Sequence, residues 1–353
     1  MAIDHLQPGD LVDKTIDAHS HLGVSLKSYA CLEYPYAQSV EGLYYRQLAG
    51  GVDVNVVFPF SPDLFFNIHR LVEGLAVPDV NPISPAPYVR ENRLLMQEVF
   101  LCCPELQHRF LPFVSVDPGR EVAAQIAALE QLEEDYPIYG IKILPVFCQT
   151  RITALLDEGR PILEFARSRD IPFLLHTTSD AREEYSHARF AFEVIERNGD
   201  LRFCLAHCIG FHRGYLERAA SLGNVWVDTA AMKIQVDLAA QGSVITASGE
   251  DRFQADYSDY RRVMRQLLEA HPTMILWGSD SPAYSYIVRR RQGKDAFQDF
   301  RLKGTYEEEV AALNCLPASL RQAACNGNTL RFLFGRRATE GIVEQPHRIR
   351  NET

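Results

Sequence analysis

Two histidines separated by one residue are the first sign of metal chemistry in this chain. His19 and His21 end a short apolar run that begins at Thr15. Because side chains alternate along a β-strand, we expect both imidazoles, together with Asp17, to point to the same side. Two imidazoles at this spacing can bind one ion, with Zn–N bonds of about 2.0–2.1 Å. Taken alone, the motif is a weak signal, and two ordinary hydrogen-bonded histidines would explain it.

Three further residues of metal-ligand type end three other apolar runs. His176 closes the run that begins at Pro172, His207 closes one that begins at Arg202, and Asp280 follows a third. If these runs are parallel strands, their carboxyl ends meet at one edge of the sheet. Five ionisable groups packed there without a cation would be costly to bury. We therefore predict a metal site formed by His19, His21, His176, His207 and Asp280.

Lys142 is a charged residue inside an apolar strand pattern that covers residues 140–144. Strand alternation sends Ile141 and Ile143 outward and Lys142 inward. A buried lysine must be paired, neutral or chemically modified. Two alternatives follow. Lys142 forms an ion pair with Asp17 or with a bound carboxylate, or it is carbamylated by CO₂ and bridges two metal ions.

Eight short apolar runs alternate with helical patterns along the chain. The runs are bounded mostly by Gly, Pro, Asp or Asn, which is typical of strands. The alternation favours a parallel sheet of the α/β class, and eight strands in 353 residues favour a closed (β/α)₈ TIM barrel. The predicted strands are residues 15–19, 52–58, 110–116, 139–144, 172–176, 202–207, 224–228 and 273–277. The predicted helices between and after them are residues 121–134, 152–169, 188–198, 214–222, 257–270, 306–314, 317–325 and 329–334.

Three segments that follow strands are longer than a barrel requires. We expect them at the carboxyl-terminal mouth, where barrel enzymes bind substrates. Arg46, Arg90 and Arg182 lie in or beside loops near this mouth and could hold a substrate carboxylate, although most arginines are simply solvated. The chain is interpreted as one domain over residues 1–353, with the barrel at about 14–285, closing helices at about 300–335 and a tail at 339–353. The long segments are residues 22–50, 59–90 and 230–254.

The composition limits the partners and the compartment. The net charge is −10 and no long basic run occurs, so nucleic acid and anionic membranes are poor candidates. No stretch of about 18 apolar residues is present, and the first thirteen residues lack a signal-peptide pattern. The eight cysteines form no CxxC pair, as expected for reduced thiols. We expect a cytoplasmic protein that acts on a small molecule, with a homodimer left open by its aromatic loops.

The order of these motifs resembles the amidohydrolase superfamily of metal-dependent barrels. The shared order is Asp-x-His-x-His, Gly-x-Lys, His, His and Gly-Ser-Asp. Residues 275–282, ILWGSDSP, and 326–335, NGNTLRFLFG, are similar to the branch that also contains aminocarboxymuconate semialdehyde decarboxylase. In such decarboxylases the resemblance implies one metal at the positions of His19, His21, His176 and Asp280, with His207 beside it. In phosphotriesterase-like members it implies a carbamylated Lys142 and a second metal that His207 joins.

Two reactions are compatible with this set. The leading hypothesis is hydrolysis of a small-molecule C–N, ester or lactone bond by a metal-activated water, with Asp280 accepting the proton and His207 stabilising the oxyanion. The alternative is non-oxidative decarboxylation of an aromatic or unsaturated carboxylic acid. A barrel that binds a ligand without catalysis is the third interpretation. The ligand types suit Zn²⁺, as one ion or two, while Mn²⁺, Fe²⁺ and Co²⁺ are chemically acceptable.

Overall fold

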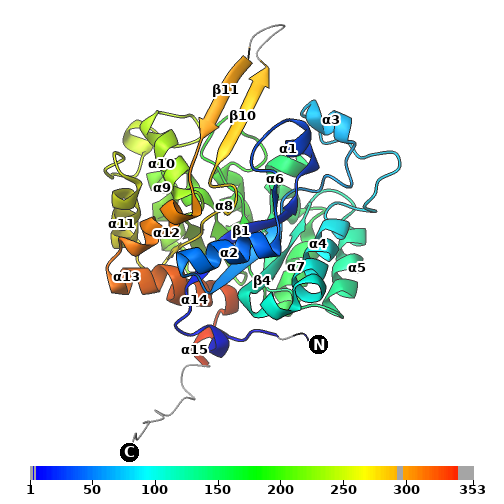
Figure 1. Cartoon of the computed structure of the whole chain (residues 1–353), viewed down its shortest axis with the longest axis horizontal. Coiled ribbons are helices and arrows are strands. Elements are labelled where there is room, and N and C mark those ends of the chain that lie inside the picture. The colour runs from blue at the N-terminus through cyan, green and yellow to red at the C-terminus, as the bar shows by residue number, and fades with distance from the viewer. Residues whose placement is uncertain (1–2, 4, 292–296, 341–353) are drawn as a thin grey trace, which may run out of the picture.

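The chain folds around a curled, mainly parallel sheet (Figure 1). The computed structural model describes residues 3, 5–291 and 297–340. Eight parallel strands follow one another in the order β1, β3, β4, β5, β6, β7, β8, β9, and β2 pairs antiparallel with β1. The strands are β1 Ile16–Val24, β2 Ala37–Gln38, β3 Val54–Pro59, β4 Phe110–Val116, β5 Gly140–Ile143, β6 Phe173–Leu175, β7 Phe203–Leu205, β8 Val225–Asp228 and β9 Ile275–Leu276.

Backbone hydrogen bonds close the sheet into a barrel. The N–H of Ala18 on β1 donates to the carbonyl of Trp277 at 3.0 Å, and the N–H of His21 donates to the carbonyl of Ser281 at 2.7 Å. These bonds join the first strand to the segment that continues β9. The predicted TIM-barrel fold is therefore confirmed, and each of the eight predicted strand segments overlaps a barrel strand.

Helices cover the outside of the sheet (Figure 1). The predicted helix over residues 152–169 is divided into a 3₁₀ turn, Ile152–Leu156, and a helix that begins at residue 160. Gly159 lies at the break, where an added Cβ would be 2.6 Å from the carbonyl oxygen of Pro118. The helices are α1 Leu26–Ala30, α2 Val40–Gly50, α3 Ile68–Val72, α4 Val89–Gln97, α5 Val122–Glu133, α6 Pro145–Cys148, α7 Arg160–Arg169, α8 Ala188–Glu196, α9 Arg213–Ser221, α10 Met232–Ala240, α11 Tyr260–Ala270, α12 Tyr306–Asn314, α13 Ala318–Gln322, α14 Asn328–Phe334 and α15 Arg337–Glu340.

A β-hairpin follows the barrel, and it was not predicted. Strands β10 (Tyr286–Arg291) and β11 (Phe297–Leu302) pair antiparallel and project away from the barrel (Figure 1). The backbone of Ile287 also pairs with that of Tyr34. The closing helices begin only at α12. The predicted tail lies largely outside the described residues, and no helix of the described part is long and apolar enough to span a membrane.

Two apolar clusters hold the barrel together. The outer cluster fills the space between strands and helices and includes Ile141 and Ile143. The inner cluster fills the barrel and includes Ala18 and Leu174, and Phe332 of α14 packs against it. The inner cluster fills the barrel below the carboxyl ends of the strands. The polar residues at those ends therefore lie next to a layer of apolar side chains.

Candidate metal centre

An irregularity in β1 decides which of its residues face the barrel interior. Ile16 and Ala18 belong to the inner cluster, so Asp17 between them points the other way. Its carboxylate accepts hydrogen bonds from Asn55 (2.9 Å) and from Tyr306 of α12 (3.3 Å). The prediction that Asp17 shares a face with both histidines is therefore wrong.

The register of β1 against β3 shifts between residues 17 and 20. Such a bulge re-aims the side chains that follow it. His19 and His21 consequently both contact the ring of Phe58, which belongs to the inner cluster, at centroid distances of 5.0 and 4.6 Å. The bulge thus brings the two predicted ligands to the interior even though the simple alternation rule fails.

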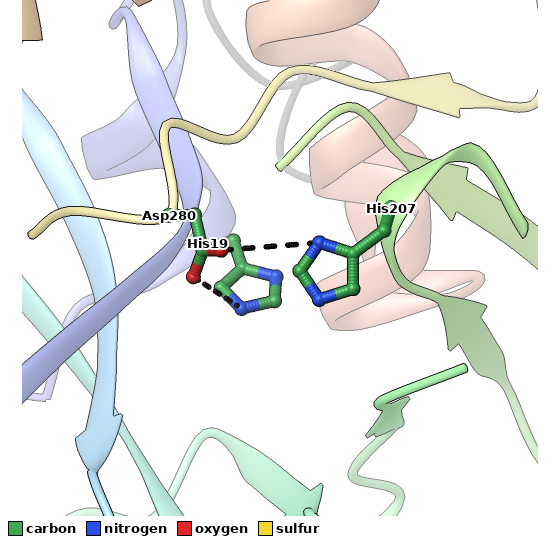
Figure 2. A group of neighbouring side chains, drawn as sticks. All are labelled: His19, His207 and Asp280. Carbon is green, nitrogen blue, oxygen red and sulfur yellow. Dashed lines mark ion pairs between the residues drawn. The ribbon is translucent and has the colours of Figure 1, made fainter. Parts of the chain in front are cut away.

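The carboxylate of Asp280 brings three of the histidines together. Its Oδ1 lies 3.3 Å from Nε2 of His19 and 3.2 Å from Nε2 of His21, while Oδ2 lies 3.8 Å from Nδ1 of His207. Figure 2 shows the contacts to His19 and His207. All four residues are at most 7 % exposed. Burial alone would raise the pKa of Asp280, but the imidazoles of His19 and His21 hold it well below its usual value.

The donor set fits a divalent cation. Nitrogen and oxygen atoms of His19, His207 and Asp280 lie within 4.8 Å of one another. Among the described residues, the buried Oδ1 of Asp280 and Nδ1 of His21 have no partner in hydrogen-bonding geometry, although Nε2 of His19 and Nε2 of His21 lie 3.3 and 3.2 Å from that Oδ1. Buried polar atoms are normally paired, so an orphaned carboxylate oxygen between imidazoles is the arrangement that a bound ion would satisfy.

His176 and His207 contact each other at the edge of this group. Nδ1 of His207 lies 3.2 Å from the carbonyl oxygen of Ala230, which can only accept, so we infer that this nitrogen carries the proton. Nε2 of His207 then accepts from Nδ1 of His176 at 3.0 Å. This leaves the lone pair of His176 on its Nε2. Both nitrogens of His207 are occupied, whereas His176 keeps one nitrogen for a metal.

Lys142 points into the barrel as predicted. Its Nζ lies 3.2 Å from Nε2 of His19 and 4.5 Å from the ring centre of Phe58. The expected ion pair with Asp17 is not formed, because Asp17 faces outward. Burial lowers the pKa of Lys142 to about 8, although the carboxylates of Asp228 and Asp280 oppose this shift.

Asp228 belongs to this group, and the sequence analysis missed it. Its Oδ2 lies 2.8 Å from Nδ1 of His19, and its Oδ1 accepts from the backbone N–H groups of His207 and Ala230, both at 3.0 Å. Burial would raise the pKa of Asp228, but the charge and hydrogen bond of His19 lower it to about 2. Asp228 ends a predicted strand, as several of the predicted ligands do, and this position was the signal available in the sequence.

A left-handed turn carries His207. Residues 207–211 all have positive φ values, between 51° and 60°. Only Gly210 tolerates this conformation freely, and it is unusual for a β-branched residue such as Ile209. The N–H of Ala247 donates to the carbonyl of Gly210 at 2.8 Å and fastens the turn. Backbone strain of this kind is concentrated at functional sites, which agrees with a chemical role for His207.

None of the three arginines suggested as carboxylate holders is shown in contact with the predicted ligands. Arg46 donates to the side chain of Gln38, and Arg182 pairs with Asp180 at 2.8 Å. Arg90 is exposed. Lys142 is thus the basic side chain that the structure brings to the predicted ligands, in place of an arginine.

The chain was compared with protein families. A family model described as Amidohydrolase matches residues 74–335, which is more than half of the chain. The chain belongs to this amidohydrolase family. The family assignment confirms the resemblance inferred from the motifs. No curated protein matches the chain in sequence.

Solved structures share the fold of this amidohydrolase-family chain at low sequence identity. The 5-carboxyvanillate decarboxylase LigW from Sphingomonas paucimobilis is 12 % identical, with a TM-score of 0.55 over 91 % of this chain and 98 % of that one. The 2,6-dihydroxybenzoate decarboxylase from Rhizobium is 13 % identical, with the same TM-score and the same coverages. A zinc-bound amidohydrolase from Burkholderia multivorans is 14 % identical, with a TM-score of 0.54 over 91 % and 99 %.

Proposed function

We propose that this amidohydrolase-family protein is a metal-dependent, non-oxidative decarboxylase of an aromatic or unsaturated carboxylic acid. The observation that carries the proposal is Lys142. This cation is fully buried beside the ligand group, and it has no carboxylate hydrogen-bond partner among the described residues. A substrate carboxylate would supply that partner. Two of the solved structures with this fold are named as decarboxylases of aromatic acids, which supports the same reaction.

We assign one divalent ion to the site. We leave His207 out of this ligand set although it belongs to the same group of atoms. Its Nδ1 faces the carbonyl oxygen of Ala230 and therefore carries a proton, whereas Nε2 of His19 faces the donor Lys142 and therefore carries a lone pair. The mixed imidazole and carboxylate set suits Zn²⁺, which the structure from Burkholderia multivorans also contains. When bound, such an ion would polarise oxygens of the substrate and stabilise developing negative charge. The residues that would hold it are His19, His21, His176 and Asp280.

The residues of the chain can then be given roles in the reaction. Lys142 pairs with the carboxylate and orients it. The bond from the carbon to the carboxylate breaks, CO₂ leaves, and the electron pair remains on the carbon until a proton replaces the lost group. We assign delivery of that proton to His207. The proton it can give is the one on Nδ1, which lies 3.2 Å from the carbonyl oxygen of Ala230 and 3.8 Å from Oδ2 of Asp280, and solvent then replaces that proton.

Hydrolysis of a C–N, ester or lactone bond is the second candidate. The buried Oδ1 of Asp280 favours it, because a carboxylate oxygen without a hydrogen-bond partner could accept the proton of an attacking water. In a two-ion form of this hydrolase, Lys142 would be carbamylated and would no longer carry a positive charge. The proposed decarboxylation therefore requires a positively charged Lys142, whereas two-ion hydrolysis requires a carbamylated one.

The experiment is a paired activity screen on protein loaded with Zn²⁺ or Mn²⁺. Aromatic and unsaturated acids are tested for CO₂ release in D₂O, and amides, esters and lactones are tested for hydrolysis. The proposal expects CO₂ together with deuterium at the carbon that carried the carboxylate. Lys142→Met, which keeps the length without the charge, should raise KM for the acid. Hydrolysis without CO₂ release would overturn the decarboxylase assignment in favour of the second candidate.

A further inference from the structure

The hairpin that follows the barrel has a free strand edge. Strand β11 pairs with β10 along one side, over six residues and without a register shift. Among the described residues, no strand pairs with the other side of β11. The hairpin projects beyond the barrel and its helices (Figure 1), which leaves this edge accessible. An unpaired edge is a template for a further strand, and β11 contains neither of the residues that commonly protect one, proline and lysine.

The backbone of Ile287 shows which groups of β11 face the free edge. Ile287 lies on β10 and exchanges both of its backbone hydrogen bonds with Tyr34, at 2.8 and 2.9 Å, so its N–H and C=O point away from β11. Residues of an antiparallel pair alternate between hydrogen-bonded and non-hydrogen-bonded positions. Arg301 lies opposite Ile287. Arg301 and Asp299, two residues before it, therefore both direct their backbone N–H and C=O groups toward the free edge.

The side chains at these two positions carry opposite charges on one face of the hairpin. Asp299 and Arg301 are both exposed, and residues two apart on a strand point the same way. Asp299 pairs with Arg289 of β10 at 3.0 Å. Arg301 forms no ion pair with another described residue. The free edge therefore offers an unpaired cation next to a carboxylate that only one cation contacts.

One antiparallel register with a second copy of the chain matches these charges. In a twofold-symmetric contact, each residue pair occurs twice. If Phe300 lies opposite Phe300 of the second copy, Asp299 lies opposite Arg301 of that copy, and both direct their backbone groups to each other. A shift of two residues in either direction places Asp299 or Arg301 opposite itself. Opposite charges across strands stabilise a pair, as aromatic pairs do, whereas like charges destabilise it.

We propose that two copies of this chain pair through their β11 edges, antiparallel about a twofold axis at Phe300. The two hairpins then form one four-stranded sheet, and a two-stranded hairpin on its own is only marginally stable in water. Asp299 lies between Arg289 of its own chain and Arg301 of the second copy. The pairing does not depend on the proposed reaction, because none of these residues belongs to the candidate metal centre.

Sedimentation velocity of the full-length protein across a wide range of concentrations tests the proposal. We expect a reversible equilibrium between monomer and dimer. Arg301→Asp replaces two attractive pairs by two repulsive ones and should raise the Kd of the dimer at least about tenfold. Arg321→Asp makes the same chemical change at an exposed position of α13 and should leave Kd unchanged. A protein that stays monomeric, or a dimer that Arg301→Asp does not weaken, would overturn the proposal.

Arg301→Pro tests the backbone contact separately from the charge. Proline has no N–H, and the N–H of Arg301 points to the free edge and not to β10, so the hairpin should keep its own hydrogen bonds. The pairing loses one donor from each copy. Arg301→Ala, which removes the charge but keeps the N–H, is the matched control. We expect the Kd of Arg301→Pro to be at least about tenfold above that of Arg301→Ala, and equal values would overturn the proposal.

A mixture of two variants tests the register. Asp299→Arg and Arg301→Asp each set like charges opposite each other when the variant pairs with itself. In a mixed dimer, positions 299 and 301 are positive in one chain and negative in the other, so both pairs are attractive again. We expect the mixed dimer to form at least about tenfold more tightly than either variant binds itself, measured with one variant fluorescently labelled. A mixture that associates no better than the separate variants would overturn the proposal.

Discussion

The substitution Asp228→Asn should weaken metal binding although Asp228 is not itself a proposed ligand. The carboxylate accepts three N–H groups, one on Oδ2 from His19 and two on Oδ1 from the backbones of His207 and Ala230. An asparagine has only one acceptor oxygen. Whichever way its amide turns, its NH₂ group faces at least one of these donors.

The cost of this change can be worked from the contacts. If the amide NH₂ faces His19, the imidazole loses the partner that fixes its proton on Nδ1 and leaves Nε2 free for a metal. If the NH₂ faces the backbone, two buried N–H groups lose their acceptor and the turn that carries His207 is disturbed. Outer partners of metal ligands are worth about 10–100-fold in metal affinity, which is roughly 1.4–2.8 kcal/mol.

The assay is competition for Zn²⁺ between the metal-free protein and a chromogenic chelator. Asp228→Asn should bind Zn²⁺ about 10–100-fold more weakly than the parent. Asp237→Asn is the control and should leave the affinity unchanged, because the Asp237 carboxylate pairs with Lys233 on the surface of α10, away from the proposed ligands. A folded Asp228→Asn protein with parental affinity would refute the reasoning that Asp228 holds His19 in its ligating state.

Three further predictions concern the site and the buried carboxyl of Glu91. His19→Ala and Asp280→Asn should each lose bound metal, seen by elemental analysis, and nearly all turnover; full activity in either would remove that residue from the site. His207→Asn should lower kcat at least about a hundredfold while metal content stays the same, and a loss of metal instead would make His207 a ligand. Glu91 should make stability fall as pH rises from about 4.5 to 7, because burial raises its pKa from 4.5 to about 7 and the folded state therefore binds the proton more tightly than the unfolded state. Urea unfolding of Glu91→Gln should lack this contribution, at most about 3 kcal/mol, and an unchanged pH profile would contradict the assignment.

The barrel and its ligand types could be predicted because they rest on short-range patterns. An apolar run in the sequence marks each strand. Four of the predicted ligands end such a run or lie just beyond it, namely His19, His176, His207 and Asp280. Convergence of these ends follows from barrel topology alone. The direction of Lys142 also followed from alternation, since its strand is regular.

The remaining features depend on contacts that local patterns do not contain. The bulge in β1 arises from pairing with β3, so alternation placed Asp17 on the wrong face. The break at Gly159 depends on the nearby carbonyl of Pro118. The left-handed turn at residues 207–211 is held by the distant Ala247, and its non-glycine residues give no local sign of positive φ. The hairpin was missed because charged residues interrupt the apolar pattern of its strands.

The most direct test of the account is to locate the metal by anomalous scattering in crystals grown with Zn²⁺, combined with elemental analysis of the same protein. We predict one ion per chain, bound by His19, His21, His176 and Asp280, with an unmodified Lys142 beside it. An ion bound elsewhere, or a protein that stays metal-free when Zn²⁺ is supplied, would contradict the account.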